Sequence, residues 1–441
     1  MINLALALVS AITIFVIWKK GIITTLSLVP ISIFVTVGIT SILFGLFGGG
    51  VIRGGGLPAL DIGGEIPSIV GIEFLKAAMF LLLGSTFIGI LYNFQAPKAL
   101  SPAEIKSSSP VTSTTITIAI VIIFSISILM LLNSGSYLLS RDTYLIDYGS
   151  LSRFYGNLHY MVPILAFVCF WLQKSKSCSS WQKFMLSTLL AFTVIESLAS
   201  ASRALSVIFL SIGLTSVYYS EIFSKIKLVI RITSYSLLTL ISYGIVLDLR
   251  TLETHGLSPY LDFLGSQDFL SYLGAISIGD IFGNLLSIIP ITYLGLSISA
   301  PSNYLSISLS PALGETSGWY QIARFMVVNP WTPSGAVAQV STVSFFTIVL
   351  AWFIVGGIIE ITARLLSSTS NLREISIITT VITLAASLQF LQYSLRAGMR
   401  FIYLQLFFVL LLYLRNKLQI SLPGYTKKVI TRNPILPNSL L

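Results

Sequence analysis

Apolar residues along this chain gather in long runs that short polar stretches separate. A helix needs about 20 predominantly apolar residues to cross the roughly 30 Å of hydrocarbon in a bilayer. We interpret eleven runs as membrane-spanning helices, at 2–18, 23–47, 70–92, 114–133, 157–173, 184–199, 204–220, 228–248, 343–363, 374–392 and 400–415. The pattern predicts an all-α polytopic membrane protein with about 11 transmembrane helices.

One stretch, 249–341, breaks this alternation because it is neither a plausible span nor a short connector. Loops much longer than about 15 residues are uncommon and usually functional. Its apolar run 283–298 is short and interrupted by Pro290, so we expect that run to be re-entrant or to lie at the membrane surface. The sequence therefore predicts one membrane domain, 1–441, with a large outer loop of short helices at 249–341.

Composition excludes a soluble protein. The chain is 55% hydrophobic and only 10% charged, against about 25% charged residues in soluble domains, and its mean hydropathy is +0.90. In such a chain a net charge of +10 reports membrane topology and not nucleic-acid binding. Its two cysteines, Cys169 and Cys178, predict no outer disulfide framework.

The basic residues predict an orientation. If the N-terminus is outside, alternate loops place 17 of the 26 cations on the inner side and 8 on the outer side, with Lys76 inside a span. This bias follows the positive-inside rule and predicts a cytoplasmic C-terminus. The first apolar run lacks a basic leading region, so we expect it to be an uncleaved span.

Every cation assigned to the outer side is an arginine, although the chain has as many lysines as arginines. Arginine presents a planar fork that binds phosphate through two parallel hydrogen bonds. The set therefore indicates a diphosphate site on the outer face, or else arginines paired with outer acids such as Asp142, Asp147 and Asp248. The eight are Arg53, Arg141, Arg153, Arg203, Arg250, Arg324, Arg396 and Arg400.

Three of these arginines stand in informative contexts. Arg396 and Arg400 are four residues apart in YSLRAGMRF, a spacing that puts both on one helical face. Such a pair either binds an anion or reaches separately to lipid headgroups. Arg203 lies in SASRAL, where small residues let helices approach closely. We expect it to be enclosed, with Glu196 as a candidate partner.

The long loop also carries candidates for sugar binding and proton transfer. Arg324 lies among aromatic residues, which suits a sugar phosphate because rings stack on sugar faces; an interfacial aromatic belt is the alternative. The rings are Trp319, Tyr320 and Trp331. Among outer acids and histidines, His255 and Glu315 are the catalytic candidates. Asp147, Asp280 and His159 are further acid or base candidates, and a solvated loop histidine is the alternative for His255.

Other charged pairs and motifs point away from catalysis. Glu73 with Lys76, and Glu360 with Arg364, have helical spacing and are expected to neutralise each other. The sequence contains no Walker loop, dinucleotide fingerprint, HExxH or GxSxG. We therefore predict no cofactor, no metal site and no nucleotide-driven pump.

In these features the chain resembles the O-antigen polymerase (Wzy) family of bacterial oligosaccharide repeat-unit polymerases. The likeness rests on the span number, the one large outer loop late in the chain, and the SASRAL and YSLRAGMRF segments. The family is also described by an arginine, ten residues and a glycine in two outer loops. Arg324 with Gly335 fits that motif, and so does Arg53 with Gly64.

The resemblance implies a membrane glycosyltransferase of the multi-span, lipid-linked-donor type in the bacterial inner membrane. Its substrate would be an oligosaccharide on undecaprenyl diphosphate, which is the leaving group, and a chain-length regulator would be a further partner. Arg203, Arg324, Arg396 and Arg400 would hold the diphosphate. A histidine or carboxylate, here His255 or Glu315, would accept the proton of the attacking hydroxyl.

Three other readings stay open at this point. An O-antigen ligase would share the donor and architecture and differ in its acceptor. A flippase or other transporter for lipid-linked oligosaccharides should carry cations within its spans and two pseudo-repeats. A membrane acyltransferase should show a His-Asp pair near the end of a span. Arginines at the outer ends of spans and one dominant outer loop favour an enzyme acting on the outer face.

Overall fold

The computed structural model describes residues 2–47, 51–52, 60–61, 66–93, 112–142, 161–175, 177–219, 225–250, 252–266, 287–312, 314, 316–329, 332–369 and 373–421. Several predicted residues lie outside this part, namely Glu315, Trp331, Arg53, Arg153, Asp147, His159 and Asp280. The described chain is almost entirely helical, in agreement with the predicted all-α membrane class.

Each predicted span coincides with a helix, within a few residues at either end. The helices are α1 (Ile2–Lys19), α2 (Thr25–Phe47), α3 (Ile66–Asn93), α4 (Ser113–Ser134), α6 (Val162–Gln173), α7 (Ser180–Ala199), α8 (Ala204–Tyr219), α9 (Lys225–Leu249), α17 (Phe345–Thr369), α18 (Arg373–Gln392) and α19 (Leu395–Ser421). Five of them, α2, α3, α4, α9 and α17, are long and apolar enough to cross a membrane. The number of eleven spans stays a prediction.

The remaining elements are short and lie mostly in the predicted outer loop. They are the 3-10 helix η2 (Gly135–Leu138), and the helices α10 (Leu257–Gly265), α13 (Ile288–Gly295), α14 (Tyr304–Leu309), α15 (Trp319–Ala323) and α16 (Ala336–Ser341). Two antiparallel pairs join β1 (Val51–Ile52) to β2 (Leu60–Asp61), and β3 (Val327–Asn329) to β4 (Thr332–Pro333).

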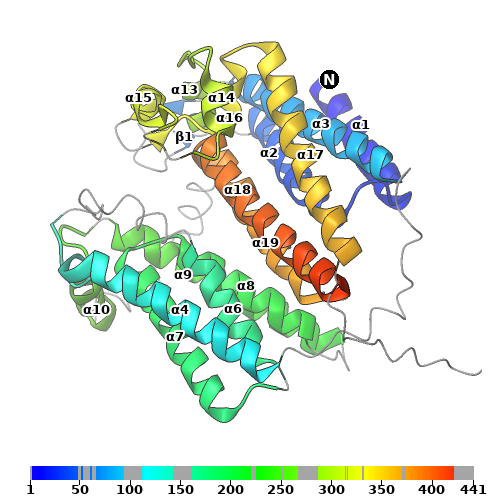
Figure 1. Ribbon diagram of the computed structural model, residues 1–441. Helices are drawn as coiled ribbons and strands as arrows, with labels where there is room; N and C mark the ends of the chain where they lie inside the picture. Colours follow the sequence, from blue (N-terminus) through cyan, green and yellow to red (C-terminus); the bar gives the residue numbers. More distant parts are fainter. Residues whose placement is uncertain are drawn as a thin grey trace, which may run out of the picture.

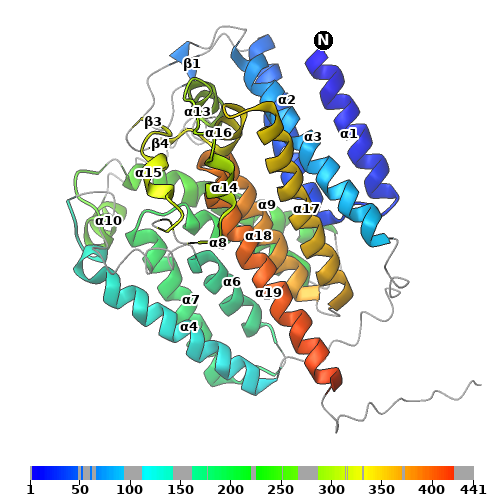
Figure 2. The same ribbon diagram turned by 45° about the horizontal axis from the view of Figure 1, so that its top comes forward.

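The long helices form two groups that α18 connects (Figure 1). One group contains α1, α2, α3 and α17 with α18 and α19, and the other contains α4 and α6 to α9 with α10. The two views agree that α18 and α19 lie between the groups (Figure 2). Contacts of α18 with α2 on one side and with α6 and α8 on the other hold the groups together.

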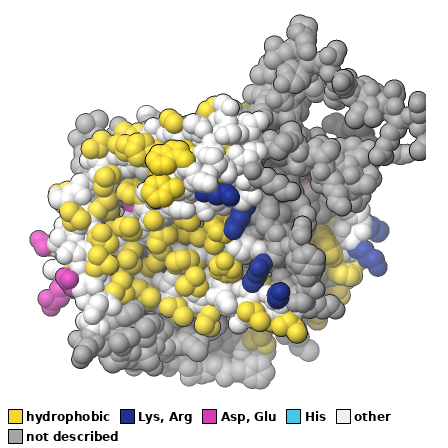
Figure 3. Space-filling model, turned by 90° about the horizontal axis from the view of Figure 1, so that it is seen from below, with side chains coloured by type: hydrophobic (Ala, Val, Ile, Leu, Met, Phe, Trp, Pro, Cys, Tyr) yellow, Lys and Arg dark blue, Asp and Glu magenta, His cyan; other side chains and the backbone are white. Residues whose placement is uncertain are grey.

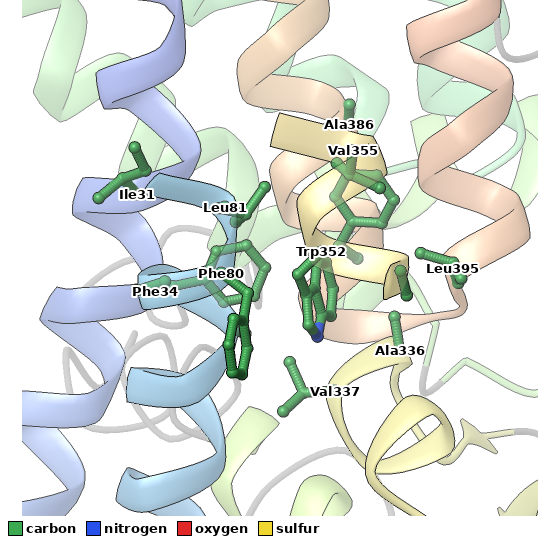
Figure 4. Close-up of a cluster of buried hydrophobic side chains, with 14 of the residues drawn as sticks. Ile31, Phe34, Phe80, Leu81, Ala336, Val337, Trp352, Val355, Ala386 and Leu395 are labelled. Carbon is green, nitrogen blue, oxygen red and sulfur yellow. The ribbon is translucent and has the colours of Figure 1, made fainter. Parts of the chain in front are cut away.

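The larger core lies in the first group and is centred on Trp352 of α17 (Figure 4). Its indole makes edge-to-face contacts with Phe34 at 5.1 Å and Phe390 at 5.7 Å between ring centroids. Edge-to-face packing is the arrangement that aromatic quadrupoles favour. Because Phe34 belongs to α2 and Phe390 to α18, this cluster fixes three helices around one side chain.

The second group presents an apolar surface. Large apolar side chains of α4 and α7, such as Leu132, Trp181 and Phe184, are exposed. Figure 3 shows apolar side chains gathered over this face, with acidic groups at one edge and Lys and Arg toward the other. An exposed apolar area of this extent is typical of a lipid-facing surface.

The short elements α13 to α16 and the β3–β4 hairpin gather at one end of the bundle, where α18 turns into α19 (Figures 1 and 2). The start of α1 lies at the same end, and α19 finishes at the opposite one (Figure 2). The described part of the 283–298 run is α13, an eight-residue helix with Ile288–Thr292 buried. At about 1.5 Å per residue it is too short to cross a bilayer.

The two ion pairs predicted from helical spacing are present. Lys76 lies 2.6 Å from Glu73, and Arg364 lies 2.7 Å from a fully buried Glu360. Arg364 also donates to the carbonyl of Gly21, and Thr24 donates to Glu360 at 3.0 Å. The second pair therefore ties the turn between α1 and α2 to α17, which is a structural role.

Candidate functional site

A pocket of about 320 Å³ lies where α15 and the β3–β4 hairpin meet the turn between α18 and α19. The charge distribution predicts this end of the bundle to be the outer one. Two arginines, an indole, an amide and two hydroxyl groups provide the polar part of its wall. The lining residues are Trp319, Ala323, Met326, Val327, Pro333, Gln339, Tyr393, Ser394, Ala397, Arg396 and Arg400.

Arg396 is the second residue of α19 and is only 3% exposed. Its guanidinium donates to the carbonyls of Ile307 at 2.5 Å and Ser310 at 3.2 Å, and to that of Ala312. These carbonyls belong to the end of α14 and the residues after it, where helix carbonyls lack helical partners. Arg396 therefore does not extend to a lipid headgroup but is enclosed by the protein.

Arg400 lies one helical turn after Arg396 and lines the same pocket, an arrangement that their spacing predicts. It is less buried than Arg396. None of the described lining residues is Asp or Glu. The two neighbouring guanidinium groups give this part of the wall a positive charge, which favours an anion.

Of the three predicted sugar-binding rings, Trp319 lines the pocket. Its ring packs 6.4 Å from that of Tyr304, and the guanidinium of Arg396 lies 5.6 Å from its centroid. Both contacts fix the indole plane against the wall. Tyr320 is 45% exposed and does not line the pocket, and Trp331 lies outside the described residues.

Arg203 and Arg324 lie near the pocket without lining it. Arg203 donates to Oε1 of Gln392 at 2.7 Å, and not, within the described contacts, to Glu196 as we expected. Gln392 directly precedes the lining residue Tyr393. Arg324 is exposed, follows the lining residue Ala323, and lies over the ring of its neighbour Phe325 at 4.6 Å.

His255 lies outside the pocket and contacts Arg141, which follows η2, and Tyr260 of α10. Its backbone exchanges two hydrogen bonds with Arg141, at 2.8 and 2.9 Å, and its Nδ1 lies 2.9 Å from the hydroxyl of Tyr260. The side chain is buried, and burial followed by the charge of Arg141 lowers the pKa of the imidazole from its usual 6.5. Through these contacts His255 helps to pack α10, and it is not one of the residues that line the pocket.

Two further arginines of the predicted outer set bind carbonyls at the end of α7. Arg141 donates to the carbonyl of Ala199 at 3.0 Å, and Nε of Arg250 donates to that of Ala201 at 3.0 Å. Ala201 has a positive φ of 43°, a conformation that costs energy for a residue with a Cβ. The two arginines therefore stabilise the strained turn between α7 and α8.

Gln339 is a lining residue that the sequence analysis missed. It lies in α16, is 1% exposed, and its Oε1 accepts a hydrogen bond of 2.6 Å from the hydroxyl of Tyr304. The only signal in the sequence is one amide within the apolar stretch AVAQVS, directly after Gly335 of the Arg324–Gly335 motif. Gly335 has a φ of 74°, which favours glycine, so the start of α16 and hence Gln339 depend on this position.

The described part of the chain contains no group of three or more His, Cys, Asp or Glu that could hold a metal ion. Comparisons with protein-family models, curated proteins and solved structures found no match to the chain. The site therefore has to be interpreted from its own residues.

Proposed function

We propose that this protein polymerises lipid-linked oligosaccharide repeat units of a bacterial surface polysaccharide, on the outer face of the inner membrane. The observation that supports it most directly is the pocket in which Arg396, Arg400 and Trp319 meet at the predicted outer end of the bundle. These three belong to the residues that the sequence indicates for diphosphate and sugar.

The chemistry of the reaction fits such a pocket. A hydroxyl of the incoming repeat unit attacks the anomeric carbon of the growing glycan, and the bond from that carbon to the diphosphate oxygen breaks. Negative charge develops on the departing diphosphate, and fixed cations near that oxygen lower the barrier. Arg400 lines the pocket and supplies such a cation, and the enclosed Arg396 adds a second positive charge next to it.

The remaining roles follow from position. Trp319 would support a sugar ring beside the diphosphate, because its indole lies in the same wall. Glu315, four residues before Trp319 in the sequence, is our candidate for the base that takes the hydroxyl proton. His255 is left out of this role because it packs against Tyr260 away from the pocket. The exposed apolar side chains of the bundle would face the bilayer and the polyprenyl tails.

Surface glycan from cells of the source organism tests the proposal. Cells lacking the protein should show a single attached repeat unit where the wild type shows a ladder of bands. Arg400→Ala should reproduce this loss. Arg400→Lys should reproduce much of it, since lysine keeps the charge and loses the fork. Arg231→Ala, an exposed arginine of α9 outside the pocket, is the matched control and should keep the ladder.

Other patterns would point to the alternatives. Polymer that accumulates without being attached to the cell surface would indicate an O-antigen ligase. Lipid-linked repeat units held on the inner leaflet would contradict an outer-face enzyme and indicate a flippase. A normal ladder in cells lacking the protein would rule out any role in this polysaccharide.

A further inference from the structure

The side chain of Gln339 is 1% exposed, and its amide nitrogen is a hydrogen-bond donor that no described residue uses. Its Oε1 is occupied by Tyr304, whereas no hydrogen bond joins its Nε2 to any described residue. Because Gln339 lines the pocket and is 99% enclosed by the protein, a ligand in the pocket is the natural partner for Nε2.

Tyr304 fixes which end of the amide faces the ligand. Its side chain is fully buried between α14 and α16, and burial raises the pKa of its hydroxyl, so that it remains protonated. A protonated phenol that donates to Oε1 leaves the two N–H groups of Gln339 on the other end of the amide. The pocket therefore receives a donor and not an acceptor from this side chain.

Arg396 contributes differently from Arg400. Its two terminal nitrogens already donate to three carbonyls of the segment 307–312, and the hydroxyl of Tyr403 donates to a fourth, that of Leu309. Three of its five N–H groups are engaged in this way, and its Nε is buried without a hydrogen-bond partner among the described residues. Arg396 thus holds the 307–312 segment and the indole of Trp319 in place, and acts on a ligand through its charge.

The wall of the pocket combines Arg400, the Gln339 amide and the charge of Arg396 with no lining carboxylate among the described residues. Such a wall suits a ligand that carries several acceptor oxygens and negative charge, as a phosphoryl group does. We propose that Arg400 and Gln339 together bind a phosphoryl group of the lipid diphosphate, with Tyr304 and Arg396 as positioning residues. This assignment rests on the proposed function for the identity of the ligand.

Binding to the full-length protein in lipid nanodiscs tests the assignment independently of polymerisation. The probe is geranylgeranyl diphosphate, compared with geranylgeraniol, which has the same tail and no phosphate. Wild-type protein should bind the diphosphate at least about tenfold more tightly than the alcohol, because a hydrogen bond to a charged group contributes about 1.5–3 kcal/mol. Inorganic pyrophosphate should compete with it.

Variants at Gln339 then distinguish the loss of the hydrogen-bond donor from the loss of the folded structure. Gln339→Met keeps the volume and removes the donor, and should weaken diphosphate binding about tenfold. Gln339→Glu keeps the shape, adds a negative charge, and should weaken it further. Tyr304→Phe should weaken diphosphate binding less, because Gln339 keeps its donor and loses only the hydrogen bond that orients its amide. The matched control is Gln405→Met, a fully buried glutamine that bonds to Thr379 and Thr383 outside the pocket.

The thermal unfolding of each variant shows whether the fold has survived, and Tyr304→Phe provides a second test if Gln339→Glu does not fold. Wild-type affinity in a folded Gln339→Met, or equal binding of the alcohol, would overturn the assignment. Binding that depends on Gln339 in a protein whose deletion leaves the glycan ladder intact would keep this phosphoryl site and reject the polymerase.

Discussion

Arginines at the predicted outer end have more than one structural role. Arg141, Arg250 and Arg396 donate to backbone carbonyls at the ends of α7 and α14. A guanidinium serves there because it has five donors and stays charged at any pH that the protein meets. Arg400 lines the pocket, as Arg396 does, and is less enclosed than Arg396. The same residue type therefore stabilises turns at some positions and, in the proposed function, binds a phosphoryl group at another.

His255 should make the stability of the protein depend on pH. Burial and Arg141 lower its pKa in the folded state, whereas the unfolded chain takes up the proton near the usual 6.5. Below that value the unfolded state binds more protons, so the free energy of unfolding falls as the pH falls. We expect the thermal midpoint to drop by a few degrees between about pH 7.5 and about pH 5.5.

His255→Asn should remove much of this dependence, because asparagine does not titrate in that range. The measurement is thermal unfolding of the purified protein at both pH values, with His159→Asn as the matched control for the other histidine. The glycan ladder should survive His255→Asn. A folded variant that lost the ladder would instead give His255 the catalytic role that the sequence suggested.

At the scale of elements, α3 and α17 approach each other through glycines. A Cβ at Gly84 would lie 2.1 Å from the carbonyl oxygen of Phe353, and one at Gly356 would lie 2.2 Å from that of Leu81. Small residues at a helix interface allow this closeness, and dispersion contacts then stabilise the pair in the absence of water. Ser85 adds a hydrogen bond of 3.1 Å to the carbonyl of Gly356.

Gly356→Ala should therefore force the two helices apart. We expect a loss of about 1–3 kcal/mol or more, as for overpacking in a core, which exceeds the gain of about 1 kcal/mol in helix propensity. Gly357→Ala is the matched control, because its Cβ would lie no nearer than 3.4 Å to Ile88 and 3.9 Å to the carbonyl oxygen of Gly84. The measurement is the thermal unfolding midpoint of both variants in nanodiscs, which should be lower for Gly356→Ala. Equal midpoints would show that the close approach of the helices is not required.

The charge distribution predicts an orientation for the whole molecule in the membrane. If the end that carries α13 to α16 is outside, Ser136 in η2 faces the outside, whereas Ser180 at the start of α7 faces the cytoplasm. Both side chains are exposed, and the native thiols of Cys169 and Cys178 are buried. A single cysteine at either position therefore reports its side of the membrane.

In a background with Cys169→Ala and Cys178→Ala, a membrane-impermeant maleimide should label Ser136→Cys in intact spheroplasts. It should label Ser180→Cys only after the membrane is opened. The reverse pattern would invert the topology, place the pocket in the cytoplasm and remove the basis of the proposed function. Labelling of both in intact spheroplasts would show that α4 or a neighbouring helix does not cross.

The positions of the long helices could be predicted from the sequence alone. Each apolar run became a helix because a chain in hydrocarbon must satisfy its backbone hydrogen bonds within the segment. The ion pairs Glu73–Lys76 and Glu360–Arg364 were also predictable, because residues three or four apart share a helical face. The same spacing predicted that Arg396 and Arg400 would lie together.

Only the tertiary structure decided which residues surround the pocket. Gln339 and Tyr304 are 35 positions apart, and Arg396 reaches carbonyls more than 80 positions earlier. Local periodicity carries no information about such contacts, because they depend on how separate helices pack. For the same reason the sequence could not show that His255 packs against α10, that Arg203 bonds to Gln392, or that Gln339 offers its amide to the pocket.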